Sequence, residues 1–161
     1  MERFIKLIVI LAISFFIVSC AASGPKFTEL SSSFTTLSPD TGRIFIYRTS
    51  FLGAGVQPEV KLNGEVIGKA APGGFFYVDR NPGNYQVLTS TEVDRTLSLT
   101  LNSGQVRYVR LDISFGFFVG HVFPVLVEDE VGKSEIRECR YEEYKPPVEQ
   151  NQKEEPGDEL K

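Results

Sequence analysis

Residues 60–67 read Val60-Lys61-Leu62-Asn63-Gly64-Glu65-Val66-Ile67, and this stretch decides the fold class. Apolar and polar residues alternate around Asn63-Gly64, as they do in a strand that buries one face. Asn-Gly is the preferred pair for a two-residue hairpin because both turn positions need a positive φ. The stretch therefore predicts a β-hairpin.

The same alternation continues outward in both directions between residues 42 and 141. Further strands are expected at residues 43–48, 75–79, 84–89, 97–101, 105–113 and 124–128, with tight turns at 81–83 and 102–104. A stretch of 100 residues suffices for one domain with one core. We predict an all-β fold, a small antiparallel β-sandwich of about seven strands that is Ig-like or transthyretin-like. A short C-terminal helix is expected over residues 133–140.

If successive strands run antiparallel, the connections must alternate between the two ends of the sandwich. The short turns at 63–64, 81–83 and 102–104 then share one end, and the longer connections share the other. We call these longer connections, residues 49–58, 68–74, 90–95 and 114–123, the loop rim. Binding residues often lie on loops that a rigid scaffold carries, so the loop rim is the expected place for function.

Two parts of the loop rim combine glycine with large apolar residues, which a solvated loop would not need. The apolar candidates for a binding surface are Phe51, Leu52, Val56, Phe117, Phe118 and Phe123. Exposed, they would offer a surface to a protein partner, an apolar ligand or the membrane. The alternative is that the aromatics fold back and close the end of the sandwich, with glycines permitting the tight path.

The polar part of the loop rim contains Glu92, Asp94 and Arg95, which either bind a ligand or pair locally. His121 is a further candidate of the binding rim, and as the one histidine it is too few for the usual structural zinc site. The sequence has no G-x-S-x-G nucleophile motif and no phosphate-binding glycine motif. We therefore expect no catalytic site, no metal and no resident cofactor.

The first 19 residues are typical of a secretion signal. Arg3 and Lys6 precede an apolar run from Leu7 to Val18, interrupted by Ser14. Its twelve positions match the apolar core of a signal peptide, whereas a membrane-spanning helix needs about 20. An uncleaved membrane helix is the alternative.

Ile17-Val18-Ser19-Cys20, which ends this run, resembles the lipobox of bacterial lipoproteins. The resemblance implies cleavage between Ser19 and Cys20, a diacylglycerol on the Cys20 sulfur and an acyl chain on its new amine. Ala21 follows the cysteine, which by the sorting rule of enteric-type bacteria implies a periplasm-facing protein of the outer membrane.

Cys139 is then left without a partner in the chain, which excludes a fold stapled by disulfides. We expect it to be a small buried apolar residue, with an intermolecular disulfide or a reactive thiol as alternatives.

Residues 20–41 contain the cysteine and a Ser/Thr-rich stretch that as a free coil would span about 25 Å. Phe27, Leu30, Phe34 and Leu37 recur there at helix-like spacing, which favours partial packing onto the domain. Residues 142–161 are acidic and proline-containing and are expected to be disordered. The formal net charge is −4 with no basic stripe, so nucleic acid is not an expected partner.

Several motifs together resemble one known family. They are Gly42-Arg43-Ile44-Phe45-Ile46-Tyr47-Arg48, Gly53-Ala54-Gly55-Val56, the 60–68 hairpin, Gly74-Phe75-Phe76, Pro82-Gly83, Thr91-Glu92-Val93-Asp94 and Gly116-Phe117-Phe118-Val119-Gly120. They look like the bacterial lipoproteins of domain-of-unknown-function family 2846, over nearly all of residues 42–141. The hairpin and Pro82-Gly83 also resemble PEGA-type and carboxypeptidase-regulatory sandwiches. The family implies a periplasm-facing β-sandwich lipoprotein and supplies no activity, ligand or catalytic residue.

These observations predict a non-enzymatic lipoprotein of the cell envelope that docks a protein partner through residues 49–58, 90–95 and 114–123. An alternative is an inhibitor or carrier that holds a foreign enzyme or a small molecule at the same rim, with polarity from Glu92, Asp94 and Arg95. A hydrolase is the third hypothesis, with the least support. The oligomeric state is not predicted.

Overall fold

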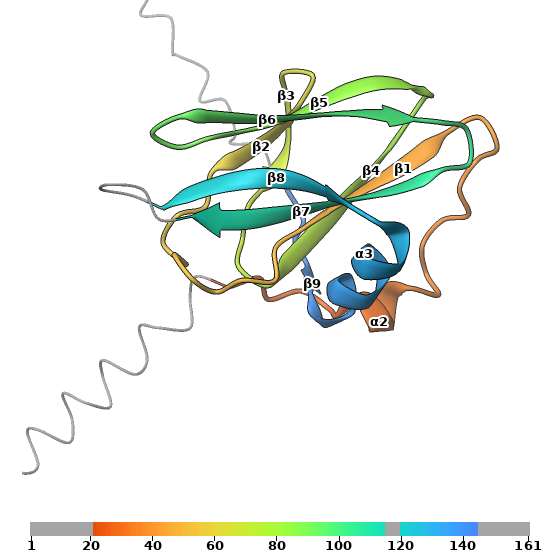
Figure 1. Ribbon diagram of the computed structural model, residues 1–161. Helices are drawn as coiled ribbons and strands as arrows, with labels where there is room; N and C mark the ends of the chain where they lie inside the picture. The colour runs from red at the N-terminus through yellow and green to blue at the C-terminus, as the bar shows by residue number, and fades with distance from the viewer. Residues whose placement is uncertain (1–20, 115–119, 145–161) are drawn as a thin grey trace, which may run out of the picture.

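The computed structural model of the chain describes residues 21–114 and 120–144. Two sheets pack face to face, with strand orders β8-β7-β1-β4-β9 and β3-β2-β5-β6 (Figure 1). The first sheet contains β1 (Gly42–Tyr47), β4 (Gly74–Arg80), β7 (Val106–Ser114), β8 (His121–Val127) and β9 (Arg140–Tyr141). The second contains β2 (Glu59–Leu62), β3 (Glu65–Lys69), β5 (Gly83–Ser90) and β6 (Asp94–Leu101). The predicted all-β sandwich is confirmed.

Strand β1 lies at the centre of the larger sheet, and every one of its residues is buried. A strand covered on both faces reads as a continuous apolar run, which Ile44 to Tyr47 provide. It pairs antiparallel with β4 and parallel with β7. The β4–β9 pair is also parallel. The prediction of an antiparallel sandwich therefore holds for most strand pairs, but not for β1–β7 and β4–β9.

The core between the sheets is built by alternate residues of their strands. It includes Ile44, Ile46, Val60, Leu62, Phe76, Val87, Leu99, Leu101, Val109, Leu111 and Val122. In β6 the buried residues Leu99 and Leu101 alternate with exposed Ser98 and Thr100, as the period of two requires.

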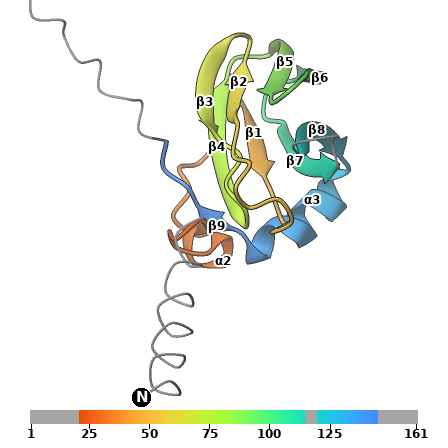
Figure 2. The ribbon, with the colours of Figure 1, turned by 90° about the vertical axis from the view of Figure 1, so that its left-hand side faces the viewer.

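A second apolar layer covers the outer face of the five-stranded sheet. Phe45, Tyr47, Phe75 and Tyr108 point to this face and contact buried Ile136 and Cys139. Three short helical segments lie over them, α2 (Phe27–Leu30), α3 (Asp129–Glu135) and the 3-10 helix η2 (Ile136–Glu138) (Figure 2). The domain therefore has two apolar cores, of which the sequence analysis anticipated one.

The C-terminal helix begins four residues earlier than predicted, at Asp129, and the helical backbone ends before Cys139. Acidic residues in a first turn interact favourably with the helix dipole, which explains the start at Asp129 and Glu130. Strand β8 likewise starts three residues earlier than predicted, so residues 121–123 belong to a strand and not to a loop. Pro124 is tolerated within β8 because β8 is an edge strand.

Residues 21–41 are folded onto the domain and do not form a free coil. Phe27 and Phe34 place their rings against Phe45, Phe75 and Tyr77 at centroid distances of 5.3–6.4 Å. The spacing of the apolar residues in this stretch favoured such packing.

The predicted signal peptide with Ser19, the lipidation candidate Cys20, the rim candidates Phe117 and Phe118, and residues 145–161 lie outside the described residues. Within residues 21–114 and 120–144, no helix is both long enough and apolar enough to cross a membrane.

Candidate functional site

The two ends of the sandwich differ as strand parity predicts. Asn63 and Gly64 have φ values of 50° and 89°, which the predicted hairpin turn requires. At the opposite end Ser90 pairs with Asp94 and Ser114 with His121, so the connections that follow β5 and β7 lie together there. The described part of the loop rim is the candidate site.

Arg48 is the residue that organises the loop rim. It follows β1, its side chain is fully buried, and all five N–H bonds of its guanidinium donate to backbone carbonyls at 2.6–3.1 Å. The acceptors belong to Ser50, Leu52, Gly53, Val56 and Ala70. Burial lowers the pKa of Arg48 from its usual value.

Arg48 was not predictable as a site residue, because its partners are backbone carbonyl groups and not side chains. One signal was available: an arginine directly follows an apolar strand and precedes a glycine-containing loop without a charge. A buried arginine in that position has to find acceptors nearby, and the loop backbone supplies them.

The apolar candidates divide into exposed and packed residues. Phe51 and Leu52 are 63% and 50% exposed, whereas Val56 packs against the inner core. The Phe51 ring lies over Gly73, where a Cβ atom would come within 2.7 Å of it. Among the described residues, three of the four exposed large apolar side chains belong to the loop rim, namely Phe51, Leu52 and Val93.

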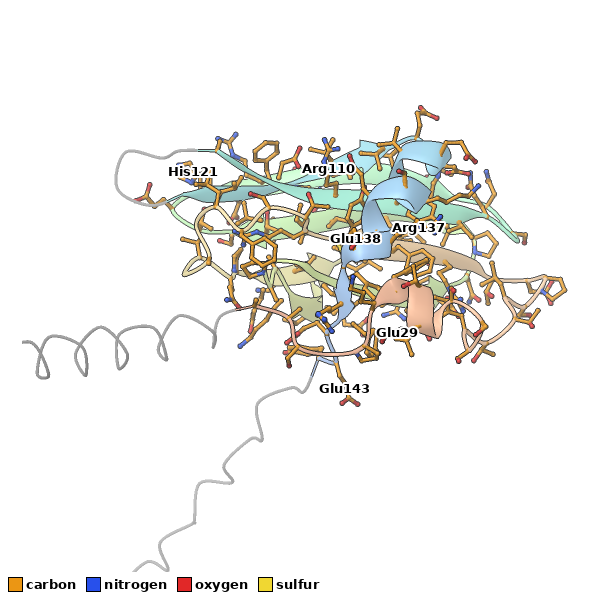
Figure 3. All side chains as sticks on the ribbon, turned by 90° about the horizontal axis from the view of Figure 1, so that it is seen from below. Glu29, Arg110, His121, Arg137, Glu138 and Glu143 are labelled. Atoms are coloured by element: carbon orange, nitrogen blue, oxygen red, sulfur yellow. The ribbon has the colours of Figure 1, made fainter. Side chains whose placement is uncertain are left out.

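Two polar candidates of the loop rim, Glu92 and Asp94, have local partners. Asp94 accepts a hydrogen bond of 2.6 Å from Ser90, and Glu92 lies 3.6 Å from Nε2 of His121. Thr91 Oγ1 lies 3.1 Å from Nδ1 of the same ring, and Figure 3 shows His121 where β8 begins. The two carboxylates thus fasten residues 90–94 to themselves and to β8, which is the local pairing named as an alternative.

Arg95 and Phe123 line a shallow depression with Thr96, Ser114 and Pro124, of about 360 Å³ and open to solvent. A second open depression, of about 420 Å³, lies between residues 55–58 and 90–92. In residues 21–114 and 120–144, no group of acidic, histidine and cysteine side chains could hold a metal ion.

A separate polar cluster joins α3 to the outer face of the sheet. Glu135 accepts hydrogen bonds from Tyr47 Oη at 2.6 Å and from Arg110 Nη1 at 2.8 Å. Arg110 also binds Asp112 at 2.7 Å (Figure 3). Burial, followed by the bond to Glu135, raises the pKa of Tyr47, so its hydroxyl stays protonated and donates. Every group in this cluster has a partner, and its evident role is to hold the helix.

Cys139 packs in the outer core and is 1% exposed, as expected for a small buried apolar residue. Burial raises the pKa of its thiol to about 12, so the nucleophilic thiolate is scarce at neutral pH.

Comparison with known proteins identifies the family. The model of a family described as protein of unknown function (DUF2846) matches residues 38–122, which is more than half of the chain. The chain belongs to this family. An uncharacterized protein of Haemophilus influenzae is 29% identical to this DUF2846 chain over 131 residues, covering 79% of the chain and 78% of the relative. No solved structure matches.

The family match extends from before β1 to the second residue of β8 and so contains almost all of the loop rim. Helices α2 and α3 and strand β9 lie outside the matched segment.

Proposed function

We propose that this DUF2846 protein is a lipid-anchored lipoprotein of the bacterial envelope whose sandwich is a non-enzymatic interaction module. Its interaction surface is the loop rim. The observation that carries the proposal is the exposure of Phe51 and Leu52 on a loop whose backbone Arg48 holds at four carbonyl groups, while its fifth hydrogen bond goes to Ala70. A rigid loop that keeps large apolar side chains in water is typical of a binding surface.

The anchor in this proposal is Cys20, at the end of the lipobox-like residues 17–20. One fatty chain gives weak and reversible membrane binding, whereas two or more hold a protein firmly. A diacylglycerol and an acyl chain on Cys20 would therefore fix the domain to a membrane, with the outer membrane as the proposed location and the periplasm as the compartment it faces.

Two measurements test the proposal. Cys20→Ser should move the protein from the membrane fraction to the soluble fraction. A photo-crosslinking residue at Phe51 should form more covalent adducts with other molecules of the envelope in cells than one at Ser103. Ser103 is an exposed residue at the opposite end of the sandwich, in the short turn 102–104. Membrane retention of the uncleaved Cys20→Ser chain would reject the anchor, and equal adduct yields at the two sites would reject the rim.

A carrier of small molecules at the same rim is the second candidate, because Arg95 lines the depression of about 360 Å³ next to Phe123. A ligand that copurifies with the protein in native mass spectrometry and is lost in Arg95→Ala would support it. The inhibitor alternative shares this surface, and no structural observation favours a hydrolase.

A further inference from the structure

The described chain enters the domain at the loop rim. The backbone N–H of Ala22 donates to the carbonyl of Pro72 at 3.1 Å, and Ala22 is buried. Pro72 belongs to the connection between β3 and β4, which is part of the loop rim, and Figure 1 shows the coloured trace beginning toward this end of the sandwich. Two peptide units separate Ala22 from Cys20, so the two Cα atoms lie within about 8 Å of each other.

The apolar tip formed by Phe51 and Leu52 lies beside this entry point. Phe51 covers Gly73, the residue that follows Pro72, and a Cβ atom at Gly74 would lie 3.1 Å from the side chain of Ala22. Residues 72–74 therefore contact both the apolar tip and the segment that leads to Cys20. A lipid on Cys20 would lie next to the tip and not a tether length away.

The loop that carries the tip can be transferred from water into a membrane interface at a low desolvation cost. Residues 49–58 contain no charged side chain. Arg48 already binds the carbonyls of Ser50, Leu52, Gly53 and Val56, and the Leu52 N–H donates to Ser50 Oγ at 3.2 Å. Backbone groups that have internal partners lose little when water is removed, whereas unpaired groups make such transfer costly.

We propose that the apolar tip inserts into the phospholipid interface of the leaflet that holds the anchor, so that the loop rim faces the membrane. This inference rests on the proposed lipidation of Cys20 and names the partner of the proposed surface. The recognition is apolar: nearby exposed charges include Lys69 and Arg95 but also Glu92 and Asp94, with no basic excess that would select anionic lipid. Neutral phospholipid is therefore a sufficient partner.

The experiment uses the lipidated protein purified from membranes and reconstituted in phosphatidylcholine vesicles. The chain contains no tryptophan, so Phe51→Trp places a single fluorophore at the tip. Val131→Trp is the matched control, because Val131 is 43% exposed but belongs to α3, away from the loop rim. Leu52→Trp provides a second probe of the tip, and circular dichroism verifies that each variant folds.

Vesicles made with brominated phosphatidylcholine should quench the emission of Phe51→Trp and Leu52→Trp about twofold, as expected for side chains at the acyl boundary. The emission of Val131→Trp should stay unchanged. Equal quenching at residues 51 and 131 would overturn the inference.

The proposed function can fail separately. If mass spectrometry finds no lipid on Cys20, the anchor and the inference both fall. A second outcome is that the lipid is present but brominated lipid does not quench the tryptophan at the tip, while a photo-crosslinker at Phe51 reacts with a protein. In that case the loop rim is an interaction surface whose partner is a protein and not the membrane.

Discussion

At the scale of single residues, Arg48 determines the shape of the loop rim. Its guanidinium replaces water for five carbonyl groups, and among the described residues it has no carboxylate partner. Burial alone accounts for the lowered pKa of Arg48. The charge of the guanidinium is stabilised by the dipoles of the carbonyl groups that it contacts and not by an anion. The network fixes residues 50–56 to each other and to Ala70. It thereby joins the connection that carries the apolar tip, residues 49–58, to the neighbouring connection, residues 68–74.

Arg48→Met tests this role, because methionine keeps much of the apolar stem and removes all five donors. We expect the free energy of unfolding to fall by at least about 3 kcal/mol, since several buried carbonyls lose their partner. Arg48→Lys should recover part of the loss, because lysine keeps the charge and three donors. Urea unfolding of the mature Cys20→Ser chain, followed by circular dichroism, measures both.

The control is Arg107→Met, since Arg107 makes a single surface hydrogen bond of 3.2 Å to the carbonyl of Thr100. A surface substitution of this kind should change the unfolding free energy by less than about 0.5 kcal/mol. Similar losses in Arg48→Met and Arg107→Met would show that the carbonyl network does not support the fold.

At the scale of elements, α3 is fitted to the outer face of the sheet through a glycine. A Cβ atom at Gly132 would lie 2.3 Å from Cγ of Tyr108, so the helix and the tyrosine approach closer than any side chain permits. Tyr108 in turn stacks on Phe45 at 5.4 Å, which leaves its ring little room to move.

Gly132→Ala should therefore destabilise the protein, although alanine in a helix is ordinarily about 1 kcal/mol more stable than glycine. The clash with Tyr108 has to be relieved by moving the helix, and overpacking of this kind costs about 1–3 kcal/mol. Ser134→Ala, at an exposed position of α3, is the control and should be neutral or slightly stabilising. A higher melting temperature for Gly132→Ala than for the parent would contradict the close packing.

The elements differ in how far their sequence determines them. The Asn63-Gly64 hairpin was predictable because its turn chemistry is local, and parity then placed the long connections at one end. The helical layer was predictable only in part. A C-terminal helix and the packing of residues 27–37 were expected, but their place on the outer face of the sheet was not, because α3 and α2 dock on Phe45, Phe75 and Tyr108, far away in sequence. The sign of where this layer lies was β1, whose consecutive apolar residues require cover on both faces.

The candidate site was predictable to a similar extent. Glycine and aromatic residues marked the loop rim, and the structure places Glu92, Asp94 and Arg95 at this end of the sandwich, beside the pairing of Ser90 with Asp94. Which apolar residues are exposed was not predictable, because Phe51 and Val56 belong to the same loop and only its path separates them. That path depends on Arg48, whose five contacts are with backbone atoms that every sequence contains.

At the scale of the whole molecule, the two end segments of the described chain hydrogen-bond to each other and to residues 72–73 of the loop rim. The N–H groups of Phe27 and Tyr141 donate to the backbone carbonyls of Cys139 and Pro25 at 2.9 and 2.8 Å. Those of Ala22 and Arg140 donate to the carbonyls of Pro72 and Gly73 at 3.1 and 2.8 Å. Residues 22–27 thus lie between the connection preceding β4 and strand β9. A membrane anchor at Cys20 would act on this rigid region directly, so the domain would have little freedom to turn its loop rim away from the bilayer.

Insertion of ten Gly/Ser residues after Ala21 tests whether this short attachment orients the domain. The added segment would let the domain move about 20 Å from the anchor and would lower the effective concentration of the apolar tip at the lipid surface on the order of tenfold. We expect brominated lipid to quench Phe51→Trp clearly less in this variant, with the unfolding free energy unchanged because the insertion precedes the hydrogen bond of Ala22 to Pro72. Undiminished quenching would mean that the tip binds the membrane by its own affinity and that the short attachment does not orient the domain. A lower unfolding free energy together with weaker quenching would mean that the insertion disturbed the packing of residues 22–27.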